Sequence, residues 1–145
     1  MGVTEGNTLG NVHGGVIMKL CDEAGAIAAM KHANRPVVTV AVDSMSFHSS
    51  IQIGELVTVQ AEVTWVGRTS LEARLVVRAE DLMAGTVTHT NTAYFVYVAL
   101  NDDGGTFEVP RLITETDEER ALFEGGVLRQ VQRLERRRLE QAITC

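Results

Sequence analysis

The fold of this chain is decided by residues 11–30, which have the sequence NVHGGVIMKLCDEAGAIAAM. The stretch opens with a double glycine and is apolar nearly all round, as is typical of a buried helix. Asp22 and Glu23 break this pattern in the middle of the helix. A carboxylate on a buried helix is costly unless it is paired, shared at an interface or used in chemistry. These two acids are therefore the first candidates for a functional site.

Length and composition indicate one compact domain over residues 1–145, with 45% hydrophobic and 22% charged residues. A net charge of −6 argues against nucleic acid as the main partner. With no apolar run of about 18 residues and no signal-peptide core, we expect no membrane association. Cys21 and Cys145 have neither disulfide nor metal-ligand spacing. Free thiols are typical of a reducing compartment, so we predict a cytoplasmic protein with a buried, structural Cys21.

After the first helix, the hydrophobic period changes from helical to alternating. We predict a helix over about residues 14–33, ended by Asn34-Arg35-Pro36, and a β-branched strand over residues 37–43. Alternating strands follow over about residues 57–65, 71–79 and 86–100, with Trp65 on the same face as Val63. Each strand has one face to bury, and only the first helix is apolar enough to cover it. The sequence thus predicts an α+β fold, a curved antiparallel sheet wrapped round one central helix.

A second helix is expected as a C-terminal extension over about residues 114–142. Thr116 and Glu119 have the spacing of a capping box. Acids cluster at the start of this helix and arginines at its end, an order that complements the helix dipole. Because we find no broad apolar stripe in it, we expect the helix to be peripheral and its arginines, including Arg133, to be solvated.

The amino end of the first helix offers unpaired backbone N–H groups and a partial positive charge. Gly14 and Gly15 leave this end open to a phosphate or to a carbonyl oxygen that becomes negative. Asp22 follows Gly15 by seven residues, roughly 10 Å of helix rise, which exceeds the reach of its side chain. If both features belong to one site, a second subunit must supply one of them, which predicts an obligate homodimer.

Several segments, taken in order, carry a family resemblance. They are NxxGNVHGG at 7–15, MKLxDEA at 18–24, VTVAVDxMxF at 38–47, VGRTSLE at 66–72, AYFVYVA at 93–99, VPRL at 109–112 and ETDEE at 115–119. Together they resemble acyl-CoA thioesterases of the hotdog fold, above all the cytosolic, brain acyl-CoA hydrolase type and its single-domain bacterial relatives. That family usually has a further strand before the asparagine motif. Only six residues precede Asn7, so that strand is expected to be absent or to lie before this sequence.

The resemblance implies hydrolysis of a fatty acyl-CoA to a free fatty acid and CoA. By position, Asp22 matches the catalytic carboxylate, as general base or nucleophile, and Asn7 matches a catalytic asparagine supplied by the partner subunit. The thioester oxygen is expected at the backbone of Gly14 and Gly15, where His13 either donates a hydrogen bond or caps the helix. The CoA phosphates are expected near four residues of one turn: Gly67, Arg68, Thr69 and Ser70.

The resemblance also implies a homohexamer built as a trimer of dimers, with the homodimer as the smallest active unit. No cofactor or metal is expected, because CoA is part of the substrate and product. Three alternatives stay open: an enoyl-CoA hydratase, a non-catalytic acyl-CoA-binding protein, and a structural protein in which Asp22 only pairs across a dimer. The hydratase typically places a histidine five residues after its aspartate, and here that residue is Ile27. Glu23 is interpreted as an ion-pair partner of Lys19.

Overall fold

The computed structural model describes residue 6, residues 11–43, residue 45 and residues 47–144. Within them the chain forms helix α1, four strands and helix α2. The elements are α1 (Gly14–Ala33), β1 (Val37–Val42), β2 (Leu56–Val66), β3 (Ser70–Asp81), β4 (Thr86–Ala99) and α2 (Asp117–Thr144). The predicted first helix and the order of strands are confirmed. The second helix begins three residues later than expected and runs to residue 144.

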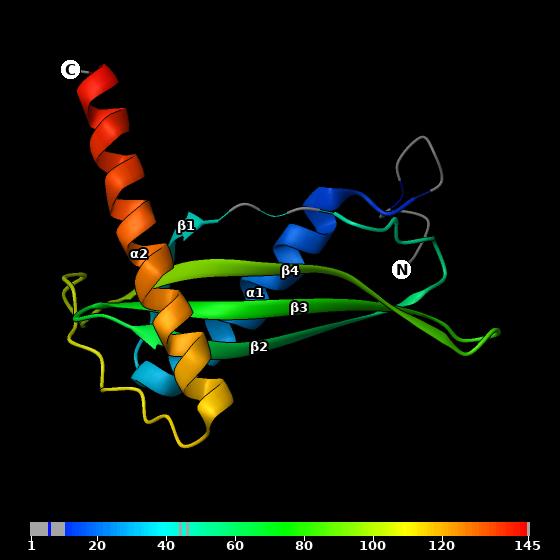
Figure 1. The fold of residues 1–145 in the computed structure, drawn as a ribbon, viewed down its shortest axis with the longest axis horizontal. Coiled ribbons are helices and arrows are strands. Elements are labelled where there is room, and N and C mark those ends of the chain that lie inside the picture. Colours follow the sequence, from blue (N-terminus) through cyan, green and yellow to red (C-terminus); the bar gives the residue numbers. More distant parts are fainter. Residues whose placement is uncertain (1–5, 7–10, 44, 46, 145) are drawn as a thin grey trace.

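All neighbouring strands are antiparallel, in the order β1-β4-β3-β2. Helix α1 lies against one face of this sheet, and α2 crosses the opposite face and projects beyond β1 (Figure 1). We call the face toward α1 the inner face and the face toward α2 the outer face. The α+β arrangement predicted from the sequence, an antiparallel sheet curved round one central helix, is confirmed.

Helix α1 is held by one row of small and apolar side chains at four-residue spacing. This row consists of Ile17, Cys21, Gly25, Ala29 and Ala33, all buried. The helix ends at Asn34, which adopts a left-handed conformation (φ 55°) and donates its N–H to the carbonyl of Met30 at 2.7 Å. His13 occupies the N-cap position, but its side chain makes no capping hydrogen bond. Neither described helix is long and apolar enough to cross a membrane.

The inner face of the sheet carries alternate residues of β3 and β4, including Leu71, Leu75, Phe95 and Tyr97, which form the core with α1. The expectation for Trp65 is wrong. The pairing of β2 with β3 shifts register between Val63 and Trp65, so Trp65 pairs with the outer-face Glu72 and lies beneath α2. A β-bulge inserts one residue and reverses the face of every side chain after it.

The predicted cap of helix α2 is confirmed, because the N–H of Glu119 donates to the hydroxyl of Thr116 at 3.1 Å. The expectation that Arg133 is solvated is wrong. Arg133 is only 7% exposed and donates from Nη1 to Glu72 at 3.0 Å and to Asp43 at 2.8 Å. Arg129 donates to both carboxylate oxygens of the fully buried Glu72, at 2.8 and 2.7 Å. Helix α2 is therefore attached to the sheet through charged groups rather than through an apolar face.

Candidate active site

Asp22 is half-buried between α1 and the sheet and is held by two hydroxyl groups. Thr39 of β1 donates from Oγ1 to Oδ1 of Asp22 at 2.6 Å. Tyr97 of β4 donates from its hydroxyl to the same Oδ1 at 3.2 Å, and the hydroxyl also lies 3.0 Å from the backbone carbonyl oxygen of Asp22. Both hydroxyl groups bind Oδ1, and no hydrogen bond to Oδ2 of Asp22 is found among the described residues.

Three elements meet at this carboxylate because of the sheet register. Thr39 pairs with Tyr97 across β1 and β4, and Leu71 pairs with Tyr97 from β3. Gly25 lies one turn after Asp22 on α1, and a Cβ added there would lie 2.3 Å from the Tyr97 hydroxyl oxygen. A side chain at position 25 would displace that hydroxyl. The glycine thus makes room for the tyrosine that orients Asp22.

The groups around Asp22 stay protonated at neutral pH. Burial, then the nearby charge of Asp22 and the hydrogen bond to it, raise the pKa of Tyr97 far above its usual value. Tyr97 is therefore a permanent hydrogen-bond donor to the carboxylate. Burial also raises the pKa of the Cys21 thiol to about 11. Cys21 is free and fully buried, so its predicted burial is confirmed. A buried thiol with a raised pKa is a poor nucleophile, which favours the structural role.

The amino end of α1 opens onto a hollow of about 230 Å³. Gly14 lines it together with Phe47, and a Cβ on Gly14 would lie 3.2 Å from Cζ of that ring. Gly15 is exposed, and none of the described residues has an atom within 4 Å of a Cβ added there. His13 is exposed beside them. Contacts with the described residues therefore do not explain why position 15 is a glycine. A ligand that approaches the backbone here would explain it.

Asp22 and the amino end of α1 belong to different ends of the sheet. The segment that covers Gly14 is tied to β4 at Thr90, where His48 donates its N–H to the Thr90 carbonyl at 3.1 Å. Asp22 is tied to β4 at Tyr97, seven residues or roughly 20 Å further along the strand. Within a single subunit, Asp22 therefore does not lie beside Gly14 and Gly15. Asn7 lies outside the described residues.

The turn proposed for CoA lies near Asp22. Ser70 pairs with Val98, the position next to the Leu71–Tyr97 pair, so the turn begins at the same end of the sheet as Asp22. The turn is closed by the N–H of Gly67, which donates to the carbonyl of Ser70 at 2.8 Å. The side chain of Arg68 is exposed there. An exposed cation on a short turn at this end of the sheet suits a phosphate group of a ligand.

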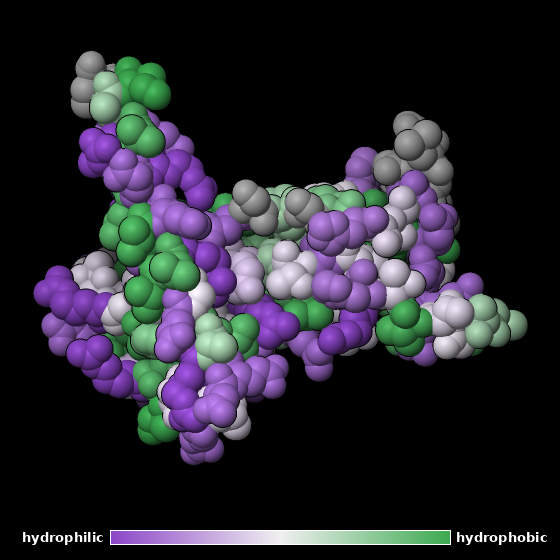
Figure 2. Space-filling view, in the orientation of Figure 1, coloured by the Kyte–Doolittle hydropathy of each residue, from purple (hydrophilic) through white to green (hydrophobic). Residues whose placement is uncertain are grey.

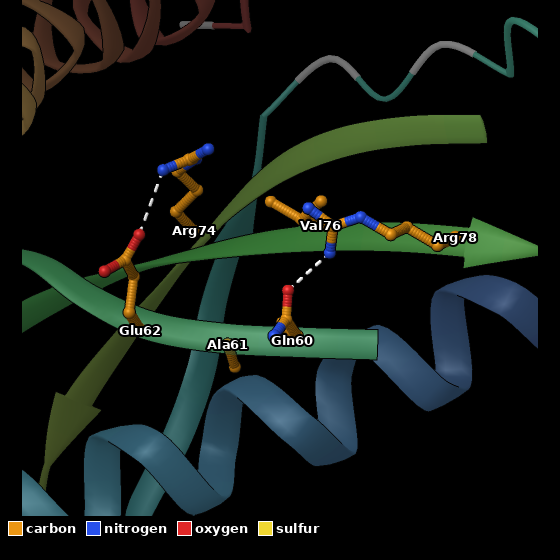
Figure 3. Close-up of a pocket in the computed structure, with 6 residues that line it drawn as sticks. All are labelled: Gln60, Ala61, Glu62, Arg74, Val76 and Arg78. Carbon is orange, nitrogen blue, oxygen red and sulfur yellow. Dashed lines mark hydrogen bonds and ion pairs between the residues drawn. The ribbon is translucent and has the colours of Figure 1, made fainter. Parts of the chain in front are cut away.

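Two other features lie apart from this site. The expected ion pair between Lys19 and Glu23 is not found among the described residues, and both side chains are exposed. A hollow of about 370 Å³ lies on the outer face of the sheet between β2 and β3. Figure 3 shows Arg74 with Glu62 and Arg78 with Gln60 across it, while Ala61 points the other way, toward α1. None of the predicted site residues lines this hollow.

Sequence reasoning missed Thr39 and Tyr97. Thr39 lies in a β-branched strand and Tyr97 in an apolar one. The strand pattern does not distinguish a hydroxyl group that contacts Asp22 from one that does not. The only usable signal is Gly25, because a glycine three residues after a buried aspartate marks a close approach. No group of three or more His, Cys, Asp or Glu side chains able to hold a metal ion is found in the described part of the chain.

Comparison with known proteins places this arrangement in a family. Residues 9–86 match the model of the thioesterase superfamily. The chain therefore belongs to the thioesterase superfamily, and its fold is the hotdog fold of that family's solved structures. The cytosolic acyl coenzyme A thioester hydrolase of Rattus norvegicus is 37% identical over 125 residues, which cover 85% of this chain and 33% of that protein. The chain thus spans a third of the length of this curated relative.

Two solved structures are similar along nearly the whole chain. An apo-hexameric acyl-CoA thioesterase is 35% identical with a TM-score of 0.89, covering 94% of this chain and 87% of that one. An acyl-CoA hydrolase from Staphylococcus aureus, in complex with butyryl-CoA, CoA and CoA disulfide, is 32% identical with a TM-score of 0.88, covering 99% and 87%. Structures of variants of that hydrolase, with an aspartate, a threonine or an asparagine replaced by alanine, also match.

Proposed function

We propose that this protein hydrolyses the thioester bond of acyl-CoA, releasing a free fatty acid and CoA. The observation that carries the proposal is the Asp22 carboxylate, held on one oxygen by Thr39 and Tyr97 in a chain of the thioesterase superfamily. Two fixed donors orient a carboxylate without neutralising it. Oδ2 is then the oxygen that acts on water or on the thioester carbon.

In the proposed reaction, Asp22 accepts a proton from a water molecule whose oxygen attacks the thioester carbonyl carbon. The carbonyl oxygen becomes negative and is stabilised by the backbone N–H groups at Gly14 and Gly15 of the second subunit. The C–S bond then breaks, and the thiolate of CoA leaves and takes up a proton. If Asp22 attacks the carbon directly, an acyl anhydride forms first and water cleaves it. Thiolate is a good leaving group, so no stronger nucleophile is needed.

The variants of the Staphylococcus aureus enzyme support the choice of residues. The asparagine, aspartate and threonine replaced in that enzyme have the same spacing along the chain as Asn7, Asp22 and Thr39 here. We assign Asn7 to the same site, contributed by the partner subunit, and Thr39 as a donor to Asp22. The turn of Gly67, Arg68, Thr69 and Ser70 is assigned to the CoA phosphates, because it carries an exposed arginine and lies at the end of β3 where Leu71 pairs with Tyr97.

We propose a homodimer as the smallest active unit. β1 is an edge of the described sheet, and its residues Val38, Val40 and Val42 are exposed. A second copy that extends the sheet along β1 covers these valines and places its α1 beside Thr39 and Asp22. The hexameric relative supports a trimer of such dimers. The rat relative, named a cytosolic hydrolase, supports a cytoplasmic location.

The direct test measures thiol release from a panel of acyl-CoA esters by the wild type, Asp22→Asn and Glu23→Gln. Asp22→Asn should lose about 100-fold or more of kcat, because the amide cannot accept the proton. Glu23→Gln is the matched control, since it removes the neighbouring exposed carboxylate and should keep the wild-type rate within about twofold. Wild type that binds CoA but releases no thiol indicates a binding protein. Full activity in Asp22→Asn overturns the role of Asp22.

A further inference from the structure

Helix α2 has an inverted amphipathic pattern. Its charged residues Arg129 and Arg133 face the sheet, where they bind Glu72, and Gly126 packs against Trp65. Residues two positions apart on a helix point to nearly opposite sides. Val131 lies between the two arginines in sequence and therefore points away from the sheet. The outward side of α2 is thus its apolar side.

This outward side is a continuous stripe. Figure 2 shows hydrophobic side chains following the exposed side of α2 toward its C-terminal end. The α2 stripe, as we call it, consists of four exposed residues: Val127, Leu128, Val131 and Leu134. Leu128 is 65% exposed and Val131 is 61% exposed. Scattered exposed hydrophobic residues are ordinary, but a row of them along one helix side marks an interaction surface. The expectation that this helix lacks an apolar stripe is wrong.

The charges of α2 point to a second copy of the same helix as the occupant. Acids lie in its first part, at Asp117, Glu118, Glu119 and Glu124, and arginines follow at Arg136, Arg137 and Arg138. Glu124 and Arg138 each lie seven residues from Val131, one before it and one after it. Seven residues are two helical turns, so both side chains share the side of Val131. Both are exposed.

We propose that the α2 stripe packs antiparallel against the α2 stripe of a second copy, about a two-fold axis at Val131. In that arrangement Val131 meets the partner's Val131, and Leu128 meets the partner's Leu134. Glu124 then meets the partner's Arg138, and the converse pair forms on the other side of the axis. In the single chain Arg138 donates from Nε and Nη2 to Glu135, at 3.1 and 2.6 Å. Its remaining Nη1 is then the donor for Glu124.

The α2 pair is an interface between dimers. From Val127 to Leu134 the stripe is roughly 10 Å long, and a helix contact of this length is small beside the about 800 Å² per partner of a standard interface. It therefore adds to an association made elsewhere. A trimer of dimers needs a second kind of contact, which joins one dimer to the next. A contact between two α2 helices about a two-fold axis can join three dimers into a closed ring. This step rests on the proposed assembly but not on the proposed reaction, because α2 lies on the opposite face of the sheet from Asp22.

The first test compares the mass of wild type and Val131→Asp by sedimentation velocity. Val131 is exposed, so the variant should keep the wild-type circular dichroism and melting curve. Two carboxylates would face each other at the axis, so we expect the assembly to fall apart into dimers. Glu124→Arg and Arg138→Glu should each weaken the assembly, and combining the two should restore it, because the opposite charges meet again. An unchanged mass in Val131→Asp overturns the proposal.

The second test is a cross-link at the axis. Val131→Cys should form a disulfide between two copies under mild oxidation, because antiparallel pairing brings the two thiols together. Met83→Cys is the matched control: position 83 is 97% exposed on the β3–β4 turn and should give only background cross-linking. Equal cross-linking in the two variants overturns the proposal. A membrane-binding surface is the competing explanation. The proposal is overturned if wild type binds vesicles of phosphatidylcholine and phosphatidylglycerol, Val131→Asp does not, and the two proteins have the same mass in solution.

Discussion

The side chain of Asp22 is placed by contacts that reach it from three elements. Gly25 on its own helix gives the Tyr97 hydroxyl room to approach, and Thr39 reaches the same carboxylate oxygen from β1. Because Tyr97 is fully buried and its pKa is raised, its hydroxyl stays protonated, and it donates to two oxygen atoms of Asp22, Oδ1 and the backbone carbonyl oxygen. Tyr97 is therefore a positioning residue for Asp22 rather than a proton donor to substrate.

Replacement of Tyr97 by phenylalanine tests this role. We expect Tyr97→Phe to lower kcat about 10-fold or more while KM stays within about twofold, because the ring still fills the core but the carboxylate loses a donor. The free energy of unfolding should fall by only about 1 kcal/mol, the usual contribution of one hydrogen bond. Steady-state kinetics and urea unfolding measure the two effects.

Tyr94→Phe is the matched control for Tyr97→Phe. Tyr94 belongs to the same strand, but its ring lies under Arg129 on the outer face, 3.7 Å from the guanidinium carbon. Removal of its hydroxyl should leave kcat unchanged. Equal kcat in Tyr97→Phe and wild type would show that the Tyr97 hydroxyl does not serve the reaction.

The sequence identifies Asp22, because a carboxylate on an apolar helix conflicts with the hydrophobic pattern. It does not identify Thr39 or Tyr97, because their roles depend on register. Thr39 and Tyr97 meet only because β1 pairs with β4, and residues so far apart in sequence carry no local trace of that pairing. Glu23 shows the converse: its predicted ion pair with Lys19 is absent from the described residues, since both side chains are exposed and gain little from pairing.

At the scale of elements, Glu72 is the point at which α2 is attached to the sheet. It lies on β3, fully buried, and binds Arg129, Arg133 and Thr64. Burial alone would raise the pKa of this carboxyl, but the hydrogen bonds from Arg129, Thr64 and Arg133 outweigh it and hold the pKa below its usual value. Glu72 therefore stays charged beneath α2 and keeps the helix in place.

We expect Glu72→Gln to lower the free energy of unfolding by about 3–5 kcal/mol, because it removes the carboxylate partner of Arg129 and leaves the buried Arg133 with Asp43 alone. The depressed pKa of Glu72 also sets the pH dependence. The contribution of Glu72 to the free energy of unfolding is complete above about pH 4.3, the pKa of a glutamate in the unfolded chain. This contribution is lost as the pH falls through the lower pKa that Glu72 has in the folded protein. The melting temperature of wild type should therefore fall more steeply between pH 5 and pH 3 than that of Glu72→Gln, as thermal unfolding measures.

Glu62→Gln is the control for Glu72→Gln. Glu62 makes an ion pair with Arg74 at 2.9 Å, but its side chain is 52% exposed, and an exposed pair contributes at most about 1 kcal/mol. A loss of stability in Glu72→Gln no larger than in Glu62→Gln would contradict the anchoring role of this network.

The elements themselves follow from the sequence more closely than their contacts do. Helix α1 begins at its double glycine and ends before Pro36, and the strands lie where the residues alternate. The predicted face of Trp65 is wrong, because a β-bulge changes the face of later residues without disturbing the hydrophobic pattern of the sequence. The prediction for Arg133 is wrong because an arginine near a helix end is usually solvated, and its burial is explained only by Asp43 and the buried Glu72, which are distant in the sequence.

At the scale of the whole molecule, the site is divided between the two ends of one sheet. Asp22 and the turn at Gly67 belong to one end, while Gly14 and Gly15 open at the other. In the proposed homodimer, a two-fold axis that crosses β1 at right angles to the strand brings the second end of a partner to the first end of this chain. The central claim is that each active site takes Asp22 from one subunit and Asn7, with the amino end of α1, from the other.

Mixing two inactive variants tests this claim most directly. Asp22→Asn and Asn7→Ala, unfolded and refolded together, form dimers in which one site has both substitutions and the other has neither. We predict thiol release of about a quarter of the wild-type rate, because half of random dimers are mixed and each has one intact site. Either variant refolded alone should stay inactive. If native mass spectrometry shows mixed dimers and no activity returns, the two residues do not come from different subunits and the shared site is wrong.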